Sequence, residues 1–269
     1  MSALPGRLVL LGHPVAHSLS PVFQNAALRR AGLPLTYEAL DVPPARLERV
    51  ASELRVADAA GNVTVPHKET FGRLCARRSP IADRVGAVNT FWTEDGVLVG
   101  DNTDVGGFEE GVVRAFGAGR RWSRVTVIGA GGSAAAVVAA TERWLETKVL
   151  LWTRSVERAA ALAARFPHVQ VATSREQAMA HAELIVNATP LGLAIGDQFP
   201  VAIQDLPAKA SVFDLVYQRG ESAWVRAARG AGHPAADGLG MLIAQGALSF
   251  ERWFGRAPDR EAMWSSVRN

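Results

Sequence analysis

A glycine-rich turn between two apolar segments constrains the fold of this chain more than any other feature. Residues 125–128 have the apolar composition of a buried strand, and Gly-Ala-Gly-Gly-Ser-Ala follows at 129–134, before an alanine-rich segment. This order matches G-x-G-x-x-[GA], in which Gly129 allows a tight turn, Gly131 lets a phosphate approach the backbone, and Ala134 lets helix and strand pack closely. It favours a dinucleotide site at the helix start over a plain glycine turn. The predicted phosphate-binding residues are Gly129, Ala130, Gly131, Gly132, Ser133 and Ala134.

The next expected strand bears on which dinucleotide binds. An NAD site usually has an acidic residue at the end of this strand, where it holds the ribose 2′-hydroxyl. This chain has none there and offers Arg154 instead, which can pair with a 2′-phosphate. A charge-assisted hydrogen bond of ~1.5–3 kcal/mol would favour NADP over NAD by roughly ten- to a hundredfold. We therefore expect Arg154 to bind the 2′-phosphate of NADP rather than to be a solvated surface arginine. The expected contacts with this part of the cofactor are Thr153, Arg154, Ser155 and Arg158.

Strand-like and helix-like segments alternate along most of the chain. The strands expected in the middle third are 125–128, 148–152, 169–172, 184–187 and 211–215, separated by mostly alanine-rich helices. The elements expected in the first third are strands at 8–11, 36–42 and 61–65 and helices at 20–30, at 45–56 and after Pro66. Segments 89–93 and 97–100 flank Glu94-Asp95-Gly96, which is typical of a hairpin. Repeated strand–helix–strand units imply an α/β fold with mostly parallel strands.

One helix start and one helix face are also readable from the pattern. Ser20 is expected to be the N-cap of its helix, with Pro21 as the first helical residue. Apolar residues between Leu239 and Trp253 recur with helical spacing, and Gln245 lies about 60° beyond the edge of this stripe. Taken alone, Gln245 would therefore be a boundary glutamine.

Composition and charge exclude several classes of function. The chain has 269 residues, of which 48% are hydrophobic and 20% charged, which is typical of a globular protein. Its net charge is +3 and its arginines are scattered, so small anionic ligands are expected rather than nucleic acid. No apolar run approaches the ~20 residues that span a bilayer, and Cys75 is the single cysteine. We expect a cytoplasmic protein with a small-molecule substrate, free of membranes, as a monomer or homodimer.

Sequence patterns for metal binding and for a serine nucleophile are missing. His13 and His17 are four residues apart, but Gly12 and Pro14 disfavour a helix there, and no H-E-x-x-H occurs. No G-x-S-x-G occurs either, so an esterase-type mechanism is not supported. We therefore expect a site without a metal ion.

Three polar stretches in the first third carry the remaining candidate residues. They are GHPVAHSLSP at 12–21, NVTVPHK at 62–68, and GAVNT at 86–90 with GDNTD at 100–104. The turn at 129–134, NATPLG at 187–192, DLVY at 214–217 and GMLIAQ at 240–245 follow in order. Together these motifs resemble those of the shikimate dehydrogenase family over nearly the whole chain.

The resemblance implies a reversible reduction of 3-dehydroshikimate to shikimate with NADPH. It implies that Ser18 and Ser20 hold the substrate carboxylate, with Thr64 and Tyr217 nearby. The residues implied to hold the ring hydroxyls are Asn62, Asn89, Asp104 and Gln245, and Lys68 and Asp104 would flank the reacting oxygen. Further cofactor contacts are implied at Asn187, Ala188, Thr189, Gly238 and Met241.

Lys68 and Asp104 suit this chemistry because the carbonyl oxygen gains a proton when hydride reaches its carbon. A lysine can supply that proton or stabilise the developing charge, and a neighbouring carboxylate can orient the lysine. Which of the two Lys68 does stays open, because burial and a neighbouring carboxylate act on a lysine in opposite directions. Taken alone, Lys68 would be a surface lysine and Asp104 a helix N-cap.

The order of the motifs predicts two domains, one inserted into the other. Residues 1–104 and 239–269 are expected to form an α/β substrate-binding catalytic domain with a mostly parallel sheet. Residues 105–238 are expected to form a Rossmann-type NADP-binding domain, with a cleft between the two. The glycine pairs Gly106-Gly107 and Gly238/Gly240 bracket the inserted part, as crossover points or as ordinary helix starts.

Three positions depart from the family pattern. Gln24 stands where histidine is usual, Arg219 where proline is common, and Thr153–Ser155 replaces Asn-Arg-Thr. These departures leave open a paralogue acting on quinate, an aminoshikimate or another cyclic polyol acid. The pair Ser18 and Ser20 favours shikimate and argues against a folate-linked dehydrogenase. A non-catalytic NADP-binding protein is the other alternative, and the presence of both Lys68 and Asp104 argues against it.

Overall fold

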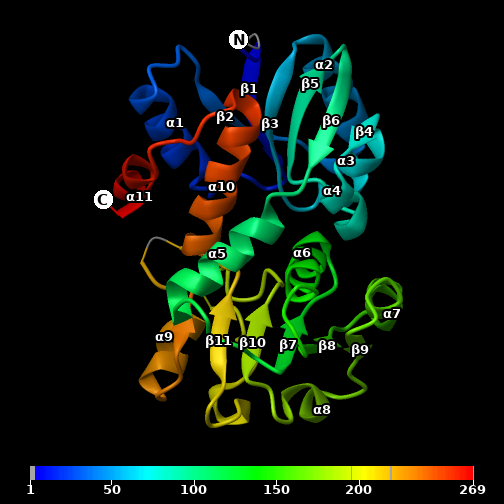
Figure 1. Ribbon diagram of the computed structural model, residues 1–269, viewed down its shortest axis with the longest axis vertical. Coiled ribbons are helices and arrows are strands. Elements are labelled where there is room, and N and C mark those ends of the chain that lie inside the picture. Colours follow the sequence, from blue (N-terminus) through cyan, green and yellow to red (C-terminus); the bar gives the residue numbers. More distant parts are fainter. Residues whose placement is uncertain (1–3, 195, 219, 269) are drawn as a thin grey trace. The chain divides into compact units, whose positions relative to one another are not determined.

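The chain forms two compact units, each built on a six-stranded sheet (Figure 1). The computed structural model describes residues 4–194, 196–218 and 220–268. The terminal unit comprises residues 1–107 and 242–269, and the inserted unit comprises 108–241. The chain passes between them at 107/108 and 241/242, where the sequence analysis expected 104/105 and 238/239.

The sheet of the terminal unit has the order β2-β1-β3-β5-β6-β4. Its strands are β1 (Arg7–Gly12), β2 (Tyr37–Asp41), β3 (Ala59–Val63), β4 (Arg77–Arg78), β5 (Thr90–Glu94) and β6 (Val97–Asp101). β1 pairs in parallel with β2 and β3, whereas β5 runs antiparallel to both β3 and β6. The β5–β6 hairpin turns at Asp95 and Gly96, both with positive φ, as the sequence predicted. The short strand β4 has no counterpart in the predicted pattern.

Helices surround this sheet and complete the core of the terminal unit. They are α1 (Ser20–Arg30), the 3-10 helix η1 (Pro44–Arg46), α2 (Leu47–Val56), α3 (Lys68–Leu74), α4 (Pro80–Val85) and α11 (Arg260–Arg268). α5 (Asp104–Phe116) and α10 (Leu239–Phe254) each run from one unit into the other. Leu54 of α2 and Phe71 of α3 pack with Val9, Leu11 and Phe91 of the sheet. α1 packs against α11, as Figure 1 shows.

The sheet of the inserted unit has the order β12-β11-β10-β7-β8-β9, and every pair in it is parallel. Its strands are β7 (Arg124–Ile128), β8 (Lys148–Trp152), β9 (Val169–Val171), β10 (Leu184–Asn187), β11 (Ser211–Asp214) and β12 (Ala235–Ala236). Its own helices are α6 (Gly132–Thr141), α7 (Val156–Ala163), α8 (Arg175–Met179), η2 (Ile203–Asp205) and α9 (Ala223–Gly230). This doubly wound order is that of a Rossmann-type sheet, so the predicted α/β class is confirmed.

Three local predictions need correction. Ser20 is not the N-cap of α1: the cap position is Leu19, no side chain caps the helix, and the Ser20 N–H is instead donated to Ser18 Oγ at 3.2 Å. The strand expected at 61–65 ends at Val63 because the chain turns there, with the His67 N–H donated to the Thr64 carbonyl. The helix expected from residue 45 begins as η1, and α2 starts only at Leu47.

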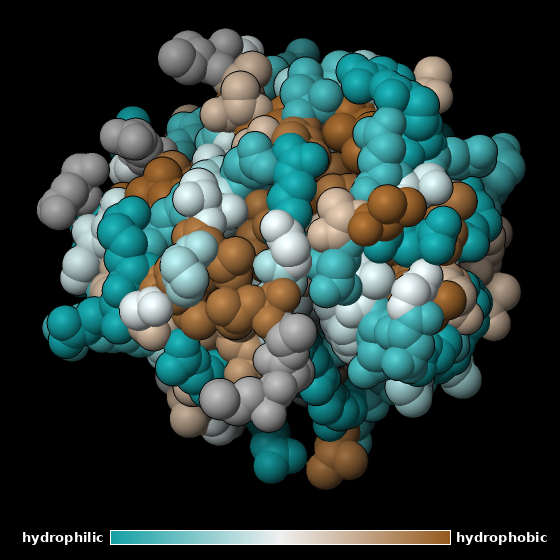
Figure 2. Space-filling view, turned by 90° about the horizontal axis from the view of Figure 1, so that it is seen from above, coloured by the Kyte–Doolittle hydropathy of each residue, from teal (hydrophilic) through white to brown (hydrophobic). Residues whose placement is uncertain are grey.

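The face of the molecule seen in Figure 2 interleaves hydrophilic and hydrophobic residues, with brown patches separated by teal side chains. Among the described residues, no helix combines the length and the apolar character needed to cross a membrane.

Candidate functional site

The strand directions of the terminal unit bring its polar motifs to one edge of the sheet. β1, β3 and β6 run the same way, because β5 is antiparallel to both β3 and β6. The stretches that begin at residues 12, 62 and 101 therefore emerge together at the carboxyl ends of these strands. Asn89 directly precedes β5, whose start lies at the same edge. Carboxyl ends of strands are where open α/β sheets usually bind ligands.

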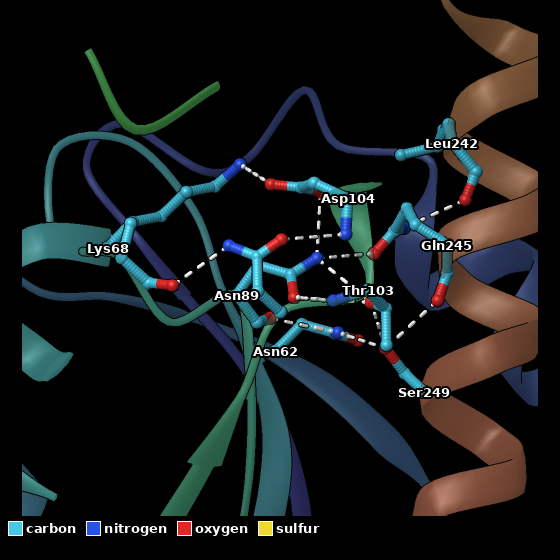
Figure 3. Close-up of polar contacts among 10 residues, drawn as sticks. Asn62, Lys68, Asn89, Thr103, Asp104, Leu242, Gln245 and Ser249 are labelled. Carbon is cyan, nitrogen blue, oxygen red and sulfur yellow. Dashed lines mark hydrogen bonds and ion pairs between the residues drawn. The ribbon is translucent and has the colours of Figure 1, made fainter. Parts of the chain in front are cut away.

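Lys68 and Asp104 meet at this edge as a buried ion pair (Figure 3). Lys68 is the first residue of α3 and Asp104 the first of α5, and Lys68 Nζ lies 2.6 Å from Asp104 Oδ2. Their side chains are only 12% and 5% exposed, which rules out the surface-lysine interpretation. The Asn102 side chain orders the turn before α5: its Oδ1 accepts the Asp104 N–H, and its Nδ2 donates to the Ala87 carbonyl.

Asn89 joins the ion pair to α10. Its Nδ2 donates to Asp104 Oδ1 at 2.7 Å and lies 3.2 Å from Gln245 Oε1. Its Oδ1 accepts the Thr103 N–H at 2.7 Å, which orients the amide. Figure 3 shows Lys68, Asp104, Asn89 and Gln245 grouped together, with Gln245 on the side of α10 that faces Asn89. This grouping puts one ammonium, one carboxylate and two amides within reach of one small polar ligand.

Asn62 is buried beneath this group with its donors already used. Its Nδ2 donates to Ser249 Oγ at 2.8 Å and to the Asn89 carbonyl at 3.0 Å, while its Oδ1 accepts from Tyr37 Oη at 2.8 Å. An amide has two N–H donors and two acceptor lone pairs, so only one acceptor position of Asn62 is left for a ligand hydroxyl.

Sequence reasoning missed three residues of this cluster: Tyr37, Thr103 and Ser249. Ser249 Oγ bonds to Asn62 and lies 3.0 Å from Thr103 Oγ1, so it connects two motif stretches. It is completely buried and lies one helical turn after Gln245 on α10. That four-residue spacing is the one signal by which it could have been found, because residues i and i+4 share a helix face.

The residues predicted to hold a carboxylate lie near the ends of β1 and β3. Ser18 Oγ accepts the Ser20 N–H, and Ser20 is buried. The Thr64 N–H is donated to the Leu11 carbonyl. The methyl carbon of Thr64 would lie 2.5 Å from a Cβ on Gly12. Tyr217 follows β11 in the inserted unit, so its predicted contact with the same carboxylate stays a prediction.

The glycine turn of the inserted unit has the form that a dinucleotide phosphate requires. Gly129 has φ +116°, and a Cβ on it would lie 3.1 Å from the Ala188 carbonyl oxygen. Gly131 is the N-cap residue of α6, with no side-chain hydrogen bond at the cap and open space where a Cβ would point. Ala134 is completely buried against the sheet. The first N–H groups of this ten-residue helix can therefore bind an anion, and the residues fit a pyrophosphate.

The strand end that selects the cofactor carries an exposed arginine. Arg154 follows β8, and its side chain forms no hydrogen bond or ion pair with any other described residue. Ser155 is the N-cap of α7, where its Oγ accepts the Arg158 N–H at 3.4 Å. An unpaired guanidinium at this place suits a 2′-phosphate, and no acidic side chain occupies it.

The remaining predicted cofactor residues lie at the end of β10 and around the start of α10. Asn187 is completely buried, and its Nδ2 donates to Asp214 Oδ1 at 2.8 Å. A Cβ on Gly238 would lie 2.2 Å from the Leu215 carbonyl oxygen, so this position requires glycine. Met241 is buried, and a Cβ on Gly111 would lie 3.1 Å from its backbone nitrogen.

Of the positions that depart from the family pattern, Gln24 is structural. It is buried, its Nε2 donates to the Gly246 carbonyl at 2.9 Å, and its Oε1 has no partner among the described residues. It thus ties α1 to α10 one residue after Gln245. Arg219 lies outside the described residues.

A Rossmann-type unit with a phosphate-binding turn, joined to an α/β unit with a buried lysine–carboxylate pair, defines a dinucleotide-dependent dehydrogenase of two units. The family model for the "Shikimate dehydrogenase substrate binding domain" matches residues 10–91, and that for the "Shikimate 5'-dehydrogenase C-terminal domain" matches 238–268. The chain belongs to the shikimate dehydrogenase family, which confirms the resemblance drawn from the motifs.

Individual relatives agree with this membership. The chain is 37% identical to a shikimate dehydrogenase (NADP(+)) of Chelativorans sp. (strain BNC1), over 94% of this chain and 92% of that one. Among solved structures, shikimate dehydrogenase from Aquifex aeolicus is 34% identical with a TM-score of 0.90, covering 100% of both chains. Shikimate 5-dehydrogenase from Thermus thermophilus, in complex with NADP(H) and shikimate, is 38% identical with a TM-score of 0.88, covering 99% of both chains.

Proposed function

We propose that this protein is an NADP-dependent shikimate dehydrogenase, which reversibly reduces 3-dehydroshikimate to shikimate in the pathway to chorismate and the aromatic amino acids. The observation that carries the proposal is the buried pair of Lys68 and Asp104, with Asn89 and Gln245 beside it. A pair of this kind provides a proton carrier and a carboxylate at one place, which reduction of a ketone to an alcohol needs.

The terminal unit supplies the groups that act on the substrate. Lys68 and Asp104 flank the reacting oxygen, where the ammonium gives a proton or stabilises the oxygen's negative charge. Asn89, Asp104 and Gln245 hold ring hydroxyls, and Asn62 accepts from one through its remaining acceptor position. Ser18, Ser20 and Thr64 hold the carboxylate. These roles rest on the family resemblance and on the clustering of the same side chains at one edge of the sheet.

The inserted unit holds NADP. Bound NADPH supplies the hydride, and the chain's own residues bind and orient it. The N-terminus of α6, from Gly131 onward, binds the pyrophosphate, while Arg154 with Thr153, Ser155 and Arg158 binds the 2′-phosphate. The residues that contact the rest of the cofactor are Asn187, Ala188, Thr189, Gly238 and Met241. We place this chemistry in the cytoplasm, with a small-molecule substrate, without nucleic acid or a membrane, and with the protein as a monomer or homodimer.

A spectrophotometric assay of NADP⁺ and NAD⁺ reduction, with shikimate and quinate side by side, tests the function. We expect shikimate oxidation with NADP⁺. Activity on quinate alone would show that the protein is a paralogue with a different substrate. The absence of turnover with either acid would indicate a non-catalytic NADP-binding protein.

The cofactor assignment has its own test in Arg154. We expect kcat/KM for NADPH to exceed that for NADH by roughly ten- to a hundredfold, because a charge-assisted hydrogen bond to the 2′-phosphate is lost with NADH. Arg154→Ala should remove most of this difference, and Arg121→Ala, at an exposed arginine of the same unit, should retain it. A wild-type preference for NADH would contradict the assignment.

A further inference from the structure

Asp214, the last residue of β11, is a completely buried carboxylate to which no role has so far been assigned. Its Oδ1 accepts from Asn187 Nδ2 at 2.8 Å and from the Val216 N–H at 3.1 Å, and its Oδ2 accepts from Ser222 Oγ at 2.8 Å. Burial of a carboxylate costs solvation free energy, and three hydrogen-bond donors offset that cost here and hold the side chain in one orientation.

The hydrogen bond from Asn187 decides which way the Asn187 amide faces. A carboxylate only accepts hydrogen bonds, so the NH₂ group of Asn187 must point at Asp214. Its second N–H then reaches the Leu191 carbonyl at 3.0 Å, and its Oδ1 accepts the Thr189 N–H at 3.0 Å and the Thr189 hydroxyl at 2.6 Å. With the amide reversed, the contacts to Asp214, the Leu191 carbonyl and the Thr189 N–H would be lost, and only the Thr189 hydroxyl, which can also accept, could keep a hydrogen bond. Asp214 thus determines the conformation of the loop 187–191.

This loop packs directly on the glycine turn that is proposed to bind the pyrophosphate. The Ala188 N–H is donated to the Ile128 carbonyl at 2.9 Å. A Cβ on Gly129 would lie 3.1 Å from both the Ala188 carbonyl oxygen and the Thr189 methyl carbon. A shift of the loop would therefore change the shape of the turn.

The same oxygen of Asp214 also orders the segment that supports Gly238. The Val216 N–H is donated to Asp214, and the Val216 carbonyl accepts the Gly238 N–H at 3.1 Å. Gly238 in turn has no room beside the Leu215 carbonyl. One carboxylate therefore joins the loop that carries Asn187, Ala188 and Thr189 to the segment that supports Gly238.

We propose that Asp214 is a positioning residue for NADP binding, which acts through hydrogen bonds that hold the loop 187–191 and the segment 215–216. This inference rests on the proposed NADP site. The required property is the geometry of the acceptor at Asp214 Oδ1, because that atom makes both contacts to the two segments. A neutral side chain of the same shape should therefore suffice.

Three variants separate this role from a general effect on stability. Asp214→Ala removes the acceptor. Asp214→Asn retains a carbonyl oxygen for Asn187 and Val216 and can donate to Ser222 Oγ. Ser222→Ala is the matched control, because it removes a buried hydrogen bond to the same carboxylate on the side away from both segments.

The measurement is the Kd for NADP⁺, followed by quenching of tryptophan fluorescence, with the Kd for shikimate as an internal reference. We expect Asp214→Ala to raise the Kd for NADP⁺ by roughly ten- to a hundredfold and to leave that for shikimate unchanged, because buried donors lose their partner. Asp214→Asn and Ser222→Ala should stay within about threefold of wild type. An unchanged Kd in Asp214→Ala, or an equal rise in Ser222→Ala, would overturn the inference.

Hydrogen exchange decides the inference independently of NADP. The amides of Thr189 and Leu191 bond within the loop, so both should exchange faster in Asp214→Ala than in Ser222→Ala. If Asp214→Ala does not fold, Asn187→Ala removes the same anchor with the carboxylate in place. Because Asn187 is itself a proposed cofactor contact, the readout for this variant is faster exchange of the Leu191 amide and not the Kd for NADP⁺. A wild-type protein that binds no NADP⁺ would refute the proposed function, and unchanged exchange would refute the positioning role.

Discussion

At the scale of single residues, the ion pair of Lys68 and Asp104 is held by more than its mutual attraction. Burial of two charges costs solvation free energy, which is recovered only when further hydrogen bonds complete the pair. Asn89 supplies such a bond to the second carboxylate oxygen. Asp104 thus has a separate partner for each oxygen, which holds it beside the Lys68 ammonium.

Lys68→Met removes the ammonium and retains the length of the side chain. We expect kcat to fall by roughly 10²–10⁴-fold, because the variant cannot supply or stabilise the charge that develops on the oxygen. Lys209→Met, at an exposed lysine of the inserted unit, is the control and should retain wild-type kcat. Steady-state kinetics with shikimate and NADP⁺ checks this, and near-wild-type turnover in Lys68→Met would exclude Lys68 as a catalytic residue.

At the scale of elements, two glycines at the start of α5 allow α10 to approach closely. A Cβ on Gly106 would lie 2.8 Å from Leu248, and a Cβ on Gly107 would lie 2.6 Å from the Gln245 Cβ and 2.9 Å from its backbone nitrogen. The sequence left open whether these glycines are ordinary helix starts. They lie in the first turn of α5, and their absent side chains are what places Gln245 beside Asn89.

Gly107→Ala tests this close approach. The added methyl group should push the backbone of Gln245 away and weaken its ligand contact, raising KM for shikimate about two- to tenfold. The overpacking should also lower the free energy of unfolding by ~1–3 kcal/mol. Gly230→Ala, at the end of α9 with open space around it, is the control and should change neither quantity appreciably. Wild-type KM and melting temperature in Gly107→Ala would show that α10 does not need the glycine.

At the scale of the whole molecule, Asp214 should make stability depend on pH. Burial raises the pKa of its carboxyl from 3.8 to about 6, although the hydrogen bonds from Ser222, Asn187 and Val216 lower it. The negative charge of Asp237 nearby raises the pKa of Asp214 further. Burial also raises the pKa of Asp237 itself, while Glu221 adds to that increase and Arg229 opposes it. The folded state therefore binds this proton more tightly than the unfolded chain does. Its contribution to stability is complete below about pH 4 and is lost as the pH rises through about 6.

Asp214→Asn should lack this dependence because its side chain does not titrate. Between pH 4 and pH 7 the free energy of unfolding of the variant should gain ~2 kcal/mol relative to wild type, which is the part of the cost of ionising the buried carboxyl that falls in this range. Urea unfolding of both proteins over this range measures the difference. Ser222→Asn would not serve as a control, because asparagine adds volume at this buried position. Parallel curves would contradict the raised pKa.

Features that depend on neighbouring residues follow from the amino-acid sequence alone. Strand patterns, the hairpin at Asp95-Gly96 and the turn at 129–134 were readable because side-chain alternation and glycine dihedral angles act over a few residues. The motifs also identified four candidate site residues, Lys68, Asn89, Asp104 and Gln245. Their contacts with one another could not be predicted from neighbouring residues.

How these residues are connected depends on the packing of distant elements. Asn62 bonds to Ser249 across 187 positions and Thr103 lies beside Ser249 across 146, so packing of α10 against the sheet creates both contacts. A buried polar group must find a partner wherever the fold places one, and that place follows from the arrangement of whole elements. Ser249 follows Gln245 by one helical turn and Asp214 begins the DLVY motif, but the hydrogen-bond partners of both residues became known only once the strands and helices were in place.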